Sequence, residues 1–239
     1  MAHTVNVSDL VTKVRERSNK EKSNFVTDDE IVRLLDSAHR ELYDLLVGTY
    51  EDYYVSTHSF TTTPEQREYA LPTDFYKHKS VEYSPDGGTT WITLVRFSFQ
   101  ERNLYQNQTI FFRIPTNDIL KYNVIGDELW LLPIPSQSIS CRLYYTPAPK
   151  TLTTSATPAA TETNTIDAVN GYDEYMVLDA TVNVLAKQQL DPSFHYAQRE
   201  EAKRRVMRSA ENRDEGQPWG VTDMDDLNPY YTFGGKDPW

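Results

Sequence analysis

The sequence lacks several features that would reveal a function directly. Its 239 residues include a single cysteine, Cys141, which excludes an intrachain disulfide and therefore a disulfide-stabilised scaffold. No apolar run approaches the roughly 20 residues that a membrane-spanning helix needs, and the first residues lack the apolar stretch of a signal peptide. We therefore expect a soluble protein that is made in a cytoplasm and has no membrane partner.

The signatures of catalysis and of cofactor binding are also missing. The sequence has no P-loop, no dinucleotide-binding glycine pattern and no nucleophile-elbow pattern. Glu41 and Asp44 lie three residues apart in a predicted helix, and two acids placed in this way on an exposed flank are more often solvated than catalytic. The histidines do not have the close His or Cys spacing of a zinc site; they are His3, His39, His58, His78 and His195. The sequence therefore predicts no catalytic residue, no metal and no cofactor.

Positive charge is scarce overall but is concentrated in one place. Lys and Arg number 24 against 35 Asp and Glu, which gives a net charge of -11. A surface that wraps duplex DNA requires clustered cations, so this balance disfavours such a surface and is compatible with a channel that DNA passes through without specific binding. The one basic cluster lies in a predicted C-terminal helix and is a candidate contact for an acidic partner or for the acidic tail of a neighbouring copy. It comprises Arg199, Lys203, Arg204, Arg205 and Arg208.

The strongest local signal in the sequence is a helix from Thr27 to Gly48. Its apolar residues recur at i, i+3, i+4 and i+7, which places them on one face of an α-helix. Thr27 and Glu30 have the spacing of a capping box, in which each side chain satisfies a backbone amide of the other residue. The oppositely charged pair Asp36 and Arg40 solvates one flank. The apolar face comprises Ile31, Leu34, Leu35, Ala38, Leu42, Leu45 and Leu46.

Three further helices are predicted at the two ends of the chain. One covers residues 8–18, one follows Asn170, which can cap it, and one opens at the Asp191-Pro192 pair and continues to about residue 211. The central helix and the helix after Asn170 each carry a second apolar stripe. For the central helix this indicates either two neighbours within the chain or one such neighbour and one subunit, and for the later helix it indicates burial. We predict that these second stripes form the subunit interface, with Val32, Tyr43, Val47, Val177 and Val184 as its residues.

Between the helices, residues 51–150 change to the pattern of β-strands. β-Branched and aromatic residues are frequent there, and no helical periodicity interrupts them. The SPDGG sequence at 84–88 and the Gly126-Asp127 pair are hairpin signals, because glycine tolerates positive φ angles. Closely spaced strands without intervening helices predict an inserted antiparallel β-sandwich or small barrel. The predicted strands lie around 53–63 and 69–71 and at 79–83, 90–95, 109–114, 120–125, 128–132 and 138–145.

Two segments differ in composition from the rest of the chain. Residues 151–171 are rich in Thr and Ala and have no aromatic residue, which predicts a linker or a long loop before the C-terminal helices at 172–211. Residues 212–239 form an acidic extension with six acids and two bases. This extension is either a frayed terminus or an anchor on another protein, because Trp and Tyr supply much of the burial at interfaces. Its aromatic residues are Trp219, Tyr230, Tyr231, Phe233 and Trp239.

In this order, the parts of the chain resemble the head-to-tail adaptor, or connector, proteins of short-tailed bacteriophages. The resemblance extends over roughly residues 27–210. It is carried by the LLDSAHRELYDLL helix, the YALPTDF turn at 69–75, the YNVIGDELWLLPIP hairpin at 122–135 and the Leu143-Tyr144-Tyr145 strand. The similarity implies an α+β fold in which the N- and C-terminal helices form a helical bundle, with a β domain inserted between them.

The same resemblance implies a structural virion protein without enzymatic activity. Twelve copies would form a ring under the portal protein of a DNA-filled head, assembled in the host cytoplasm. A nozzle or tail-tube protein would attach below, and the genome would pass through the centre during packaging and ejection. The extension at 212–239 would then reach onto the portal.

Two other classes of function stay open from the sequence. A peptidoglycan-degrading virion enzyme needs two carboxylates across a cleft, and a chain with 35 acids always offers candidates. A DNA-binding module would use the basic helix at 199–208 and bind with an affinity that falls steeply with salt. Cleavage of cell-wall material, or salt-dependent binding of DNA, would favour these functions over the adaptor.

Overall fold

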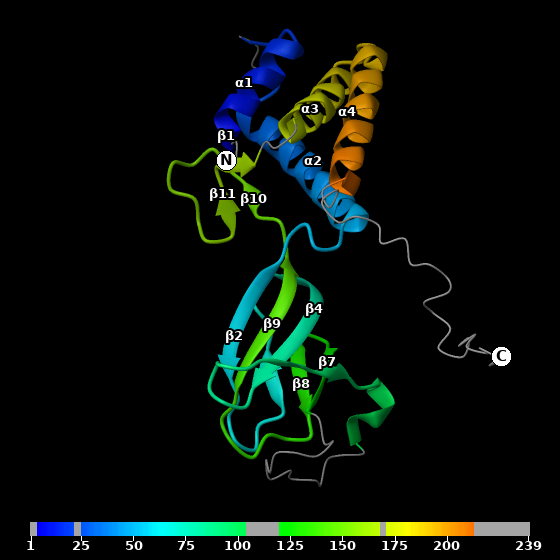
Figure 1. The fold of residues 1–239 in the computed structure, drawn as a ribbon. Coiled ribbons are helices and arrows are strands. Elements are labelled where there is room, and N and C mark those ends of the chain that lie inside the picture. The colour runs from blue at the N-terminus through cyan, green and yellow to red at the C-terminus, as the bar shows by residue number, and fades with distance from the viewer. Residues whose placement is uncertain (1–3, 22–24, 104–119, 168–170, 213–239) are drawn as a thin grey trace, which may run out of the picture.

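A computed structural model describes residues 4–21, 25–103, 120–167 and 171–212 of the chain. Figure 1 shows two parts, with helices gathered at one end and the two larger sheets at the other. The helices come from both ends of the chain and the sheets from its middle, so the mixed α+β class is confirmed. The helices are α1 (Val7–Arg17), α2 (Asp28–Thr49), α3 (Tyr172–Lys187) and α4 (Ser193–Glu211), with a short 3-10 helix at Phe99–Asn103 among the strands.

The central helix forms as its sequence predicts, and its ends lie within one residue of the predicted ones. The Thr27 hydroxyl accepts a hydrogen bond from the Glu30 backbone amide at 3.2 Å, which is one half of the capping box. The other half is replaced, because the Glu30 carboxylate accepts a hydrogen bond from Lys187 Nζ at 2.7 Å instead. Glu30 therefore ties the start of α2 to the end of α3.

The other three helices also lie where they are predicted, with different residues at their starts. Asn6 precedes α1 without a side-chain cap, and Gly171, in a left-handed conformation with φ of 79°, precedes α3 in place of the predicted cap Asn170, which lies outside the described residues. α4 begins at Ser193, so Pro192 is its N-cap residue and not its first helical residue as the Asp191-Pro192 pair predicts. Asp191 precedes the N-cap, and its Oδ1 accepts a hydrogen bond from the Ser193 amide at 2.9 Å. All four helices bury apolar residues in one shared cluster.

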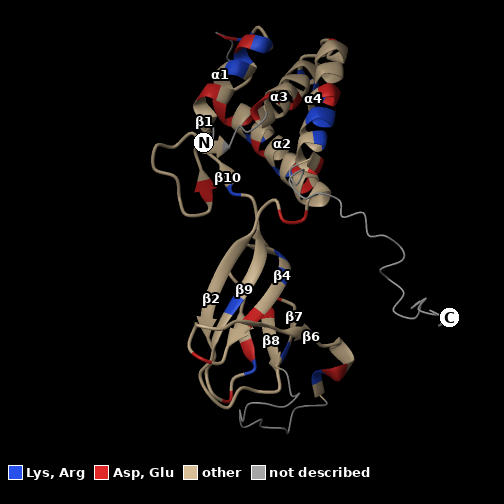
Figure 2. Ribbon diagram, viewed as in Figure 1, with Lys and Arg blue, Asp and Glu red and all other residues tan. Residues whose placement is uncertain are grey.

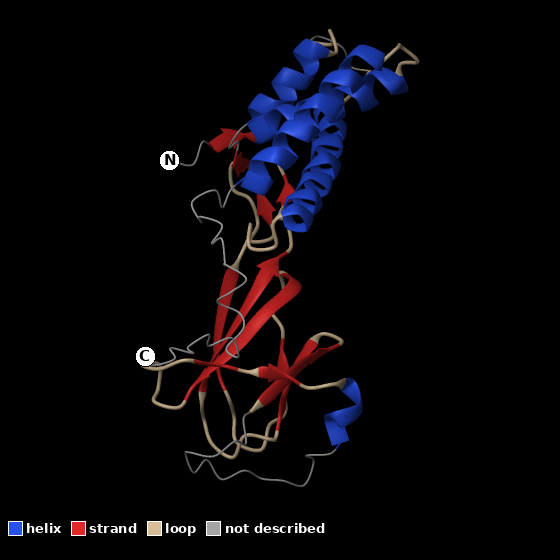
Figure 3. Ribbon diagram, turned by 45° about the vertical axis from the view of Figure 1, so that its right-hand side comes forward, coloured by secondary structure: helices blue, strands red, loops and turns tan. Residues whose placement is uncertain are grey.

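The segment at 151–171 is more ordered than its composition predicts. Strand β10 (Thr151–Leu152) pairs in parallel with β11 (Glu162–Thr163), and β12 (Thr165–Asp167) pairs with the N-terminal strand β1 (Thr4–Asn6). These short strands lie beside the helices in Figure 3. Leu152 and Ile166 are buried in the cluster that the helices share. Two apolar anchors and backbone pairing with the N-terminus are sufficient to order a segment that is otherwise polar.

The middle of the chain forms two four-stranded sheets, with strand orders β2-β9-β4-β5 and β3-β8-β7-β6. Both predicted hairpins are present, as β4–β5 across the SPDGG turn and β7–β8 across Gly126, whose φ is 62°. The two sheets contribute to one apolar cluster. The strands are β2 (Ser56–Thr61), β3 (Glu68–Ala70), β4 (Phe75–Ser84), β5 (Ile92–Thr93), β6 (Val95–Arg96), β7 (Lys121–Ile125), β8 (Glu128–Leu132) and β9 (Ser140–Pro147).

The strands are not all antiparallel, because β6 pairs in parallel with β7. The all-antiparallel prediction is wrong at this point, and the strand predicted at 109–114 lies outside the described residues. Strands β6 and β7 are separated by residues 97–120, a connection long enough for the chain to return and run parallel. After β4 the chain forms β5, which pairs with β4 in the first sheet. It then crosses to the second sheet, where β6 pairs with β7.

The helical part and the sheet part meet where the chain passes between them twice, after α2 and after β9 (Figure 1). The Tyr43 hydroxyl on α2 donates a hydrogen bond to the Pro147 carbonyl, and the Tyr43 ring stacks on Tyr54 with centroids 4.5 Å apart. The Tyr76 hydroxyl on β4 donates to Asp44 Oδ1 at 2.9 Å. The last two turns of α2 are therefore attached directly to the sheets.

Candidate functional site

The basic residues of α4 are the most concentrated positive charge in the described helices, and they lie along its middle and C-terminal half in Figure 2. The helix returns along α3, so that Arg205 lies beside Gly171 at the start of α3. One side of α4 buries Ala202, Val206 and Ala210 against the rest of the helical part. This placement divides the five predicted cations of α4 into two sets with different surroundings.

The first set, Arg199 and Lys203, forms ion pairs within the chain. Arg199 Nε lies 3.1 Å from Asp179 Oδ1 on α3, and Lys203 Nζ lies 3.1 Å from Glu41 Oε1 on α2. Asn183 Nδ2 donates a further hydrogen bond to Asp179 Oδ2 at 3.2 Å. The acidic partner predicted for these two cations is therefore internal, and the network joins α2, α3 and α4.

The two acids of this network have opposite pKa shifts. Burial raises the pKa of Asp179 above its ordinary value, although the neighbouring Arg199 opposes this effect. Burial alone would also raise the pKa of Glu41, but the hydrogen bond from Lys203, the nearby Tyr175 hydroxyl and the charges of Lys203 and Arg199 outweigh it and lower that pKa. Burial raises the pKa of the Tyr175 hydroxyl as well.

Carboxyl groups whose environments move their pKa values apart are typical of acid–base catalysis. Here Asp179 and Glu41 are both engaged by cations at an interhelical contact, and neither lines the groove between α3 and α4. Asp44, the other acid considered from the sequence, accepts the hydrogen bond from Tyr76. The arrangement is that of a structural ion-pair network between three helices.

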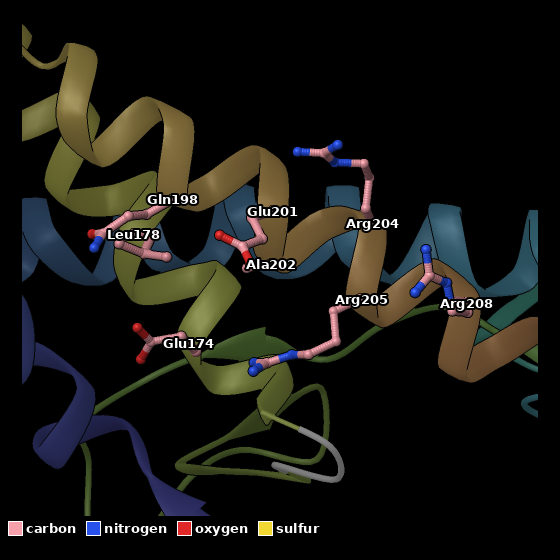
Figure 4. A pocket seen from close by; sticks show the side chains of 8 residues that line it. All are labelled: Glu174, Leu178, Gln198, Glu201, Ala202, Arg204, Arg205 and Arg208. Carbon is pink, nitrogen blue, oxygen red and sulfur yellow. The ribbon is translucent and has the colours of Figure 1, made fainter.

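The second set, Arg204, Arg205 and Arg208, lines a groove of about 640 Å³ between α3 and α4. Its apolar floor is formed by Leu178 and Ala202, and Figure 4 shows Arg205 extending toward the first turn of α3. All three arginines are exposed. None of them forms an ion pair with any residue in the described part of the chain.

The acids that border this groove do not cancel its charge. Glu174 lines the groove but is paired with Arg17 of α1, with Nη2 and Oε1 2.7 Å apart. Glu201 is the other acid in the lining. The neighbourhood therefore holds four arginines, counting Arg17, against two glutamates. Gly171 leaves room for the Arg205 side chain, because a Cβ atom at position 171 would lie 2.5 Å from Arg205 Nη2.

The predicted subunit-interface residues are mostly inside the chain. Tyr43, Val47, Val177 and Val184 are each at most 5% exposed. Val177 and Val184 are explained by the helical packing, since α3 is surrounded by its neighbours and both residues belong to the apolar cluster of the helices of the same chain. Tyr43 contacts the sheet part. Only Val32 is partly exposed, where it packs at the edge of the helical cluster.

Other predictions fall on different parts of the chain. The aromatic residues predicted to bind the portal, Trp219, Tyr230, Tyr231, Phe233 and Trp239, lie outside the described residues. Within the described ranges, no group of His, Cys, Asp and Glu side chains is arranged to hold a metal ion. None of the described helices is long and apolar enough to cross a membrane.

The ion-pair network was not predicted, although the sequence contains a signal for it. Asp179 lies in the otherwise apolar run Met176–Ala180, and a single acid in a buried helix requires a cation nearby. Arg199 is the partner that the next helix supplies. Glu41 gave no comparable signal, because its position on the flank of α2 resembles that of a solvated acid.

Comparison with protein families gives a match over most of the chain. The family model of the SU10 adaptor protein matches residues 5–225, which include all four described helices, both sheets and the groove between α3 and α4. A search of curated proteins found no match. Because the family model covers far more than half of the sequence, the chain belongs to the SU10 adaptor protein family, a family of phage head-to-tail adaptors.

Proposed function

We propose that this chain forms a ring under the portal of the phage head and joins the DNA-filled capsid to the tail. The observation that supports this proposal most strongly is the family match over residues 5–225, since it extends across the helical part and the sheet part together. A structural role is also in keeping with the α2–α3–α4 network, in which the ionisable groups hold helices together. The ring would contain twelve copies, as the resemblance to connector proteins implies.

The C-terminal extension is the proposed contact with the portal. It follows α4 directly and combines acidic residues with aromatic residues that can anchor in pockets of a partner, including Trp219 and Trp239. Removing residues 219–239 should therefore weaken portal binding at least tenfold. An affinity that is unchanged by this deletion would contradict the proposed role of the extension.

The central channel of the ring would let DNA pass without specific binding. The net charge of -11 supports this, because acids that face a lumen repel phosphate and prevent the DNA from adhering. Once a ring structure identifies the lumenal acids, changing them to amides should slow DNA ejection. Ejection at the parental rate would remove this part of the proposal.

The mass of the purified full-length chain in solution, alone and mixed with the portal protein of the same phage, tests the central proposal. A mass near that of one chain alone, together with twelve copies bound per portal ring, would support assembly templated by the portal. Rings that form without the portal and then bind it would support preassembly of the adaptor. A monomer that ignores the portal would contradict the adaptor role and call for a test of cell-wall cleavage.

A further inference from the structure

The groove between α3 and α4 has a surplus of positive charge that the described part of the chain does not use. Arg204, Arg205 and Arg208 are exposed in it without ion pairs to described residues, while Glu174 is already neutralised by Arg17. Arginine binds carboxylates in pairs of parallel hydrogen bonds. An acidic peptide is therefore the class of ligand that this groove fits best, and its apolar floor of Leu178 and Ala202 can accept an aliphatic side chain.

We propose that the acidic stretch at 223–226 of the C-terminal extension binds in this groove of the same chain. The stretch reads Asp-Met-Asp-Asp and is the place in the extension where three acids fall within four residues. Its three carboxylates match the three arginines of the groove in number. Met224, between the acids, supplies an apolar side chain for the floor.

The length of the connection permits this contact within one chain. The extension leaves α4 after Glu211, and the arginines lie between roughly 6 and 12 Å back along the helix from residue 212, at 1.5 Å per residue. The 11 residues from 212 to 223 can reach up to about 36 Å when extended. A tethered ligand within such reach has an effective concentration in the millimolar range, so even a weak site would be occupied.

This inference goes beyond the proposed function and does not depend on it. Binding at 223–226 would hold this stretch beside the first turn of α3. The aromatic residues that follow it, from Tyr230 to Trp239, would then extend from that point. It would also give a role to the three arginines of α4 that form no ion pair with described residues, whereas Arg199 and Lys203 are neutralised by Asp179 and Glu41.

A disulfide-trapping experiment on the full-length chain tests the contact. Cysteine is introduced at Glu201, which lines the groove, and at Thr222, next to the acidic stretch. The control chain carries Glu201→Cys with Gly235→Cys, whose second cysteine is beyond the stretch. The native Cys141 is buried and does not compete. Disulfide formation in a glutathione buffer is followed on non-reducing gels, with intrachain and interchain products separated by size.

An extension that does not bind would give rates that differ only through loop length, by about twofold for loops of 21 and 34 residues. We expect the Thr222→Cys chain to form the intrachain disulfide at least tenfold faster than the control. Changing Arg204, Arg205 and Arg208 to Gln should return the ratio to about twofold. The matched charge control, with Arg33, Lys77 and Lys150 changed to Gln at exposed positions elsewhere, should leave the tenfold ratio intact.

Three outcomes would overturn the inference. The first is a ratio near twofold in the parental background, and the second is a ratio that is unaffected by the three groove substitutions. The third is a product that is mainly interchain, which would assign the groove to the extension of a neighbouring copy. Because the experiment uses the isolated chain, its result is separate from that of the portal-binding measurement.

Discussion

Arg199 on α4 reaches Asp179 on α3, with Nε and Oδ1 3.1 Å apart and with side chains that are 17% and 11% exposed. The pair lies at the contact of two helices that come from the C-terminal end of the chain, and Glu41 of α2 approaches the same guanidinium at 3.6 Å. A pair this deeply buried stabilises the fold only while both members are present, because either charge alone is costly in an apolar environment. This contact therefore locks three helices in register.

Replacing Arg199 with Met should lower the free energy of unfolding by about 3 kcal/mol, because Asp179 would lose its main partner. Urea denaturation measures this change. The Arg204→Met variant is the matched control on the same helix, and its exposed position predicts a change within about 0.5 kcal/mol. Adding Asp179→Leu to Arg199→Met should recover most of the loss. If Arg199→Met and Arg204→Met lowered the free energy of unfolding equally, the network would not stabilise the fold.

The imidazole of His39 should make the free energy of unfolding depend on pH. Burial lowers its pKa below 6.5, with Arg40 contributing in the same direction and Asp36 opposing. The unfolded chain therefore binds a proton that the folded chain resists, so stability is lost as the pH falls below about 6.5, by up to about 1.4 kcal/mol per pH unit. His39→Gln should flatten this decline between pH 6.5 and 5, as read from urea midpoints. An unchanged slope would contradict the assignment to His39.

The Thr27 cap can be measured separately from packing. Thr27→Ala removes the acceptor of the Glu30 amide and should cost about 1 kcal/mol in the free energy of unfolding. Thr27→Ser keeps the hydroxyl and should stay within a few tenths of a kcal/mol of the parent. Thermal or urea unfolding distinguishes the two variants, and a Ser variant as unstable as the Ala variant would show that the hydroxyl is not the stabilising group.

Val32 remains the one predicted interface residue that has exposed surface. Val32→Asp should reduce ring assembly on the portal by at least tenfold while the melting temperature of the isolated chain stays within a few degrees. Val47, which is 3% exposed, is the contrasting position. Val47→Asp should unfold the chain, because it places an unpaired charge in the core. Full assembly by the Val32→Asp chain would exclude this residue from the subunit contact.

Helix positions were the most predictable part of the fold. In α2 the apolar period, the Thr27 cap and the Asp36–Arg40 pair all act within a few residues of one another, so local sequence contains the information. The β4–β5 and β7–β8 hairpins were predictable for the same reason, since their turns are encoded by adjacent residues.

Features that depend on distant parts of the chain were less predictable. The pairing of Val5 with Ile166 joins segments more than 150 residues apart, and no local pattern indicates it. The second stripes of α2 and α3 were assigned to a subunit contact, with two intrachain neighbours as the alternative for α2, and four of their five residues are buried within this chain. Periodicity shows that a face is buried and does not show which chain buries it. At the candidate site, the basic residues of α4 were found, but which of them form ion pairs with other described residues depends on the positions of Glu41 and Asp179.

The insertion of the sheet part between helices from the two ends of the chain has a consequence for synthesis. The paired strands from β2 to β9 are contiguous in sequence, so the sheet part can close while the ribosome is still translating the C-terminal helices. The apolar faces of α1 and α2 must wait for α3, which begins at Tyr172. At 5–20 residues per second, this delay lasts on the order of ten seconds. During that interval the exposed N-terminal helices are the segment that nascent-chain chaperones would be expected to protect.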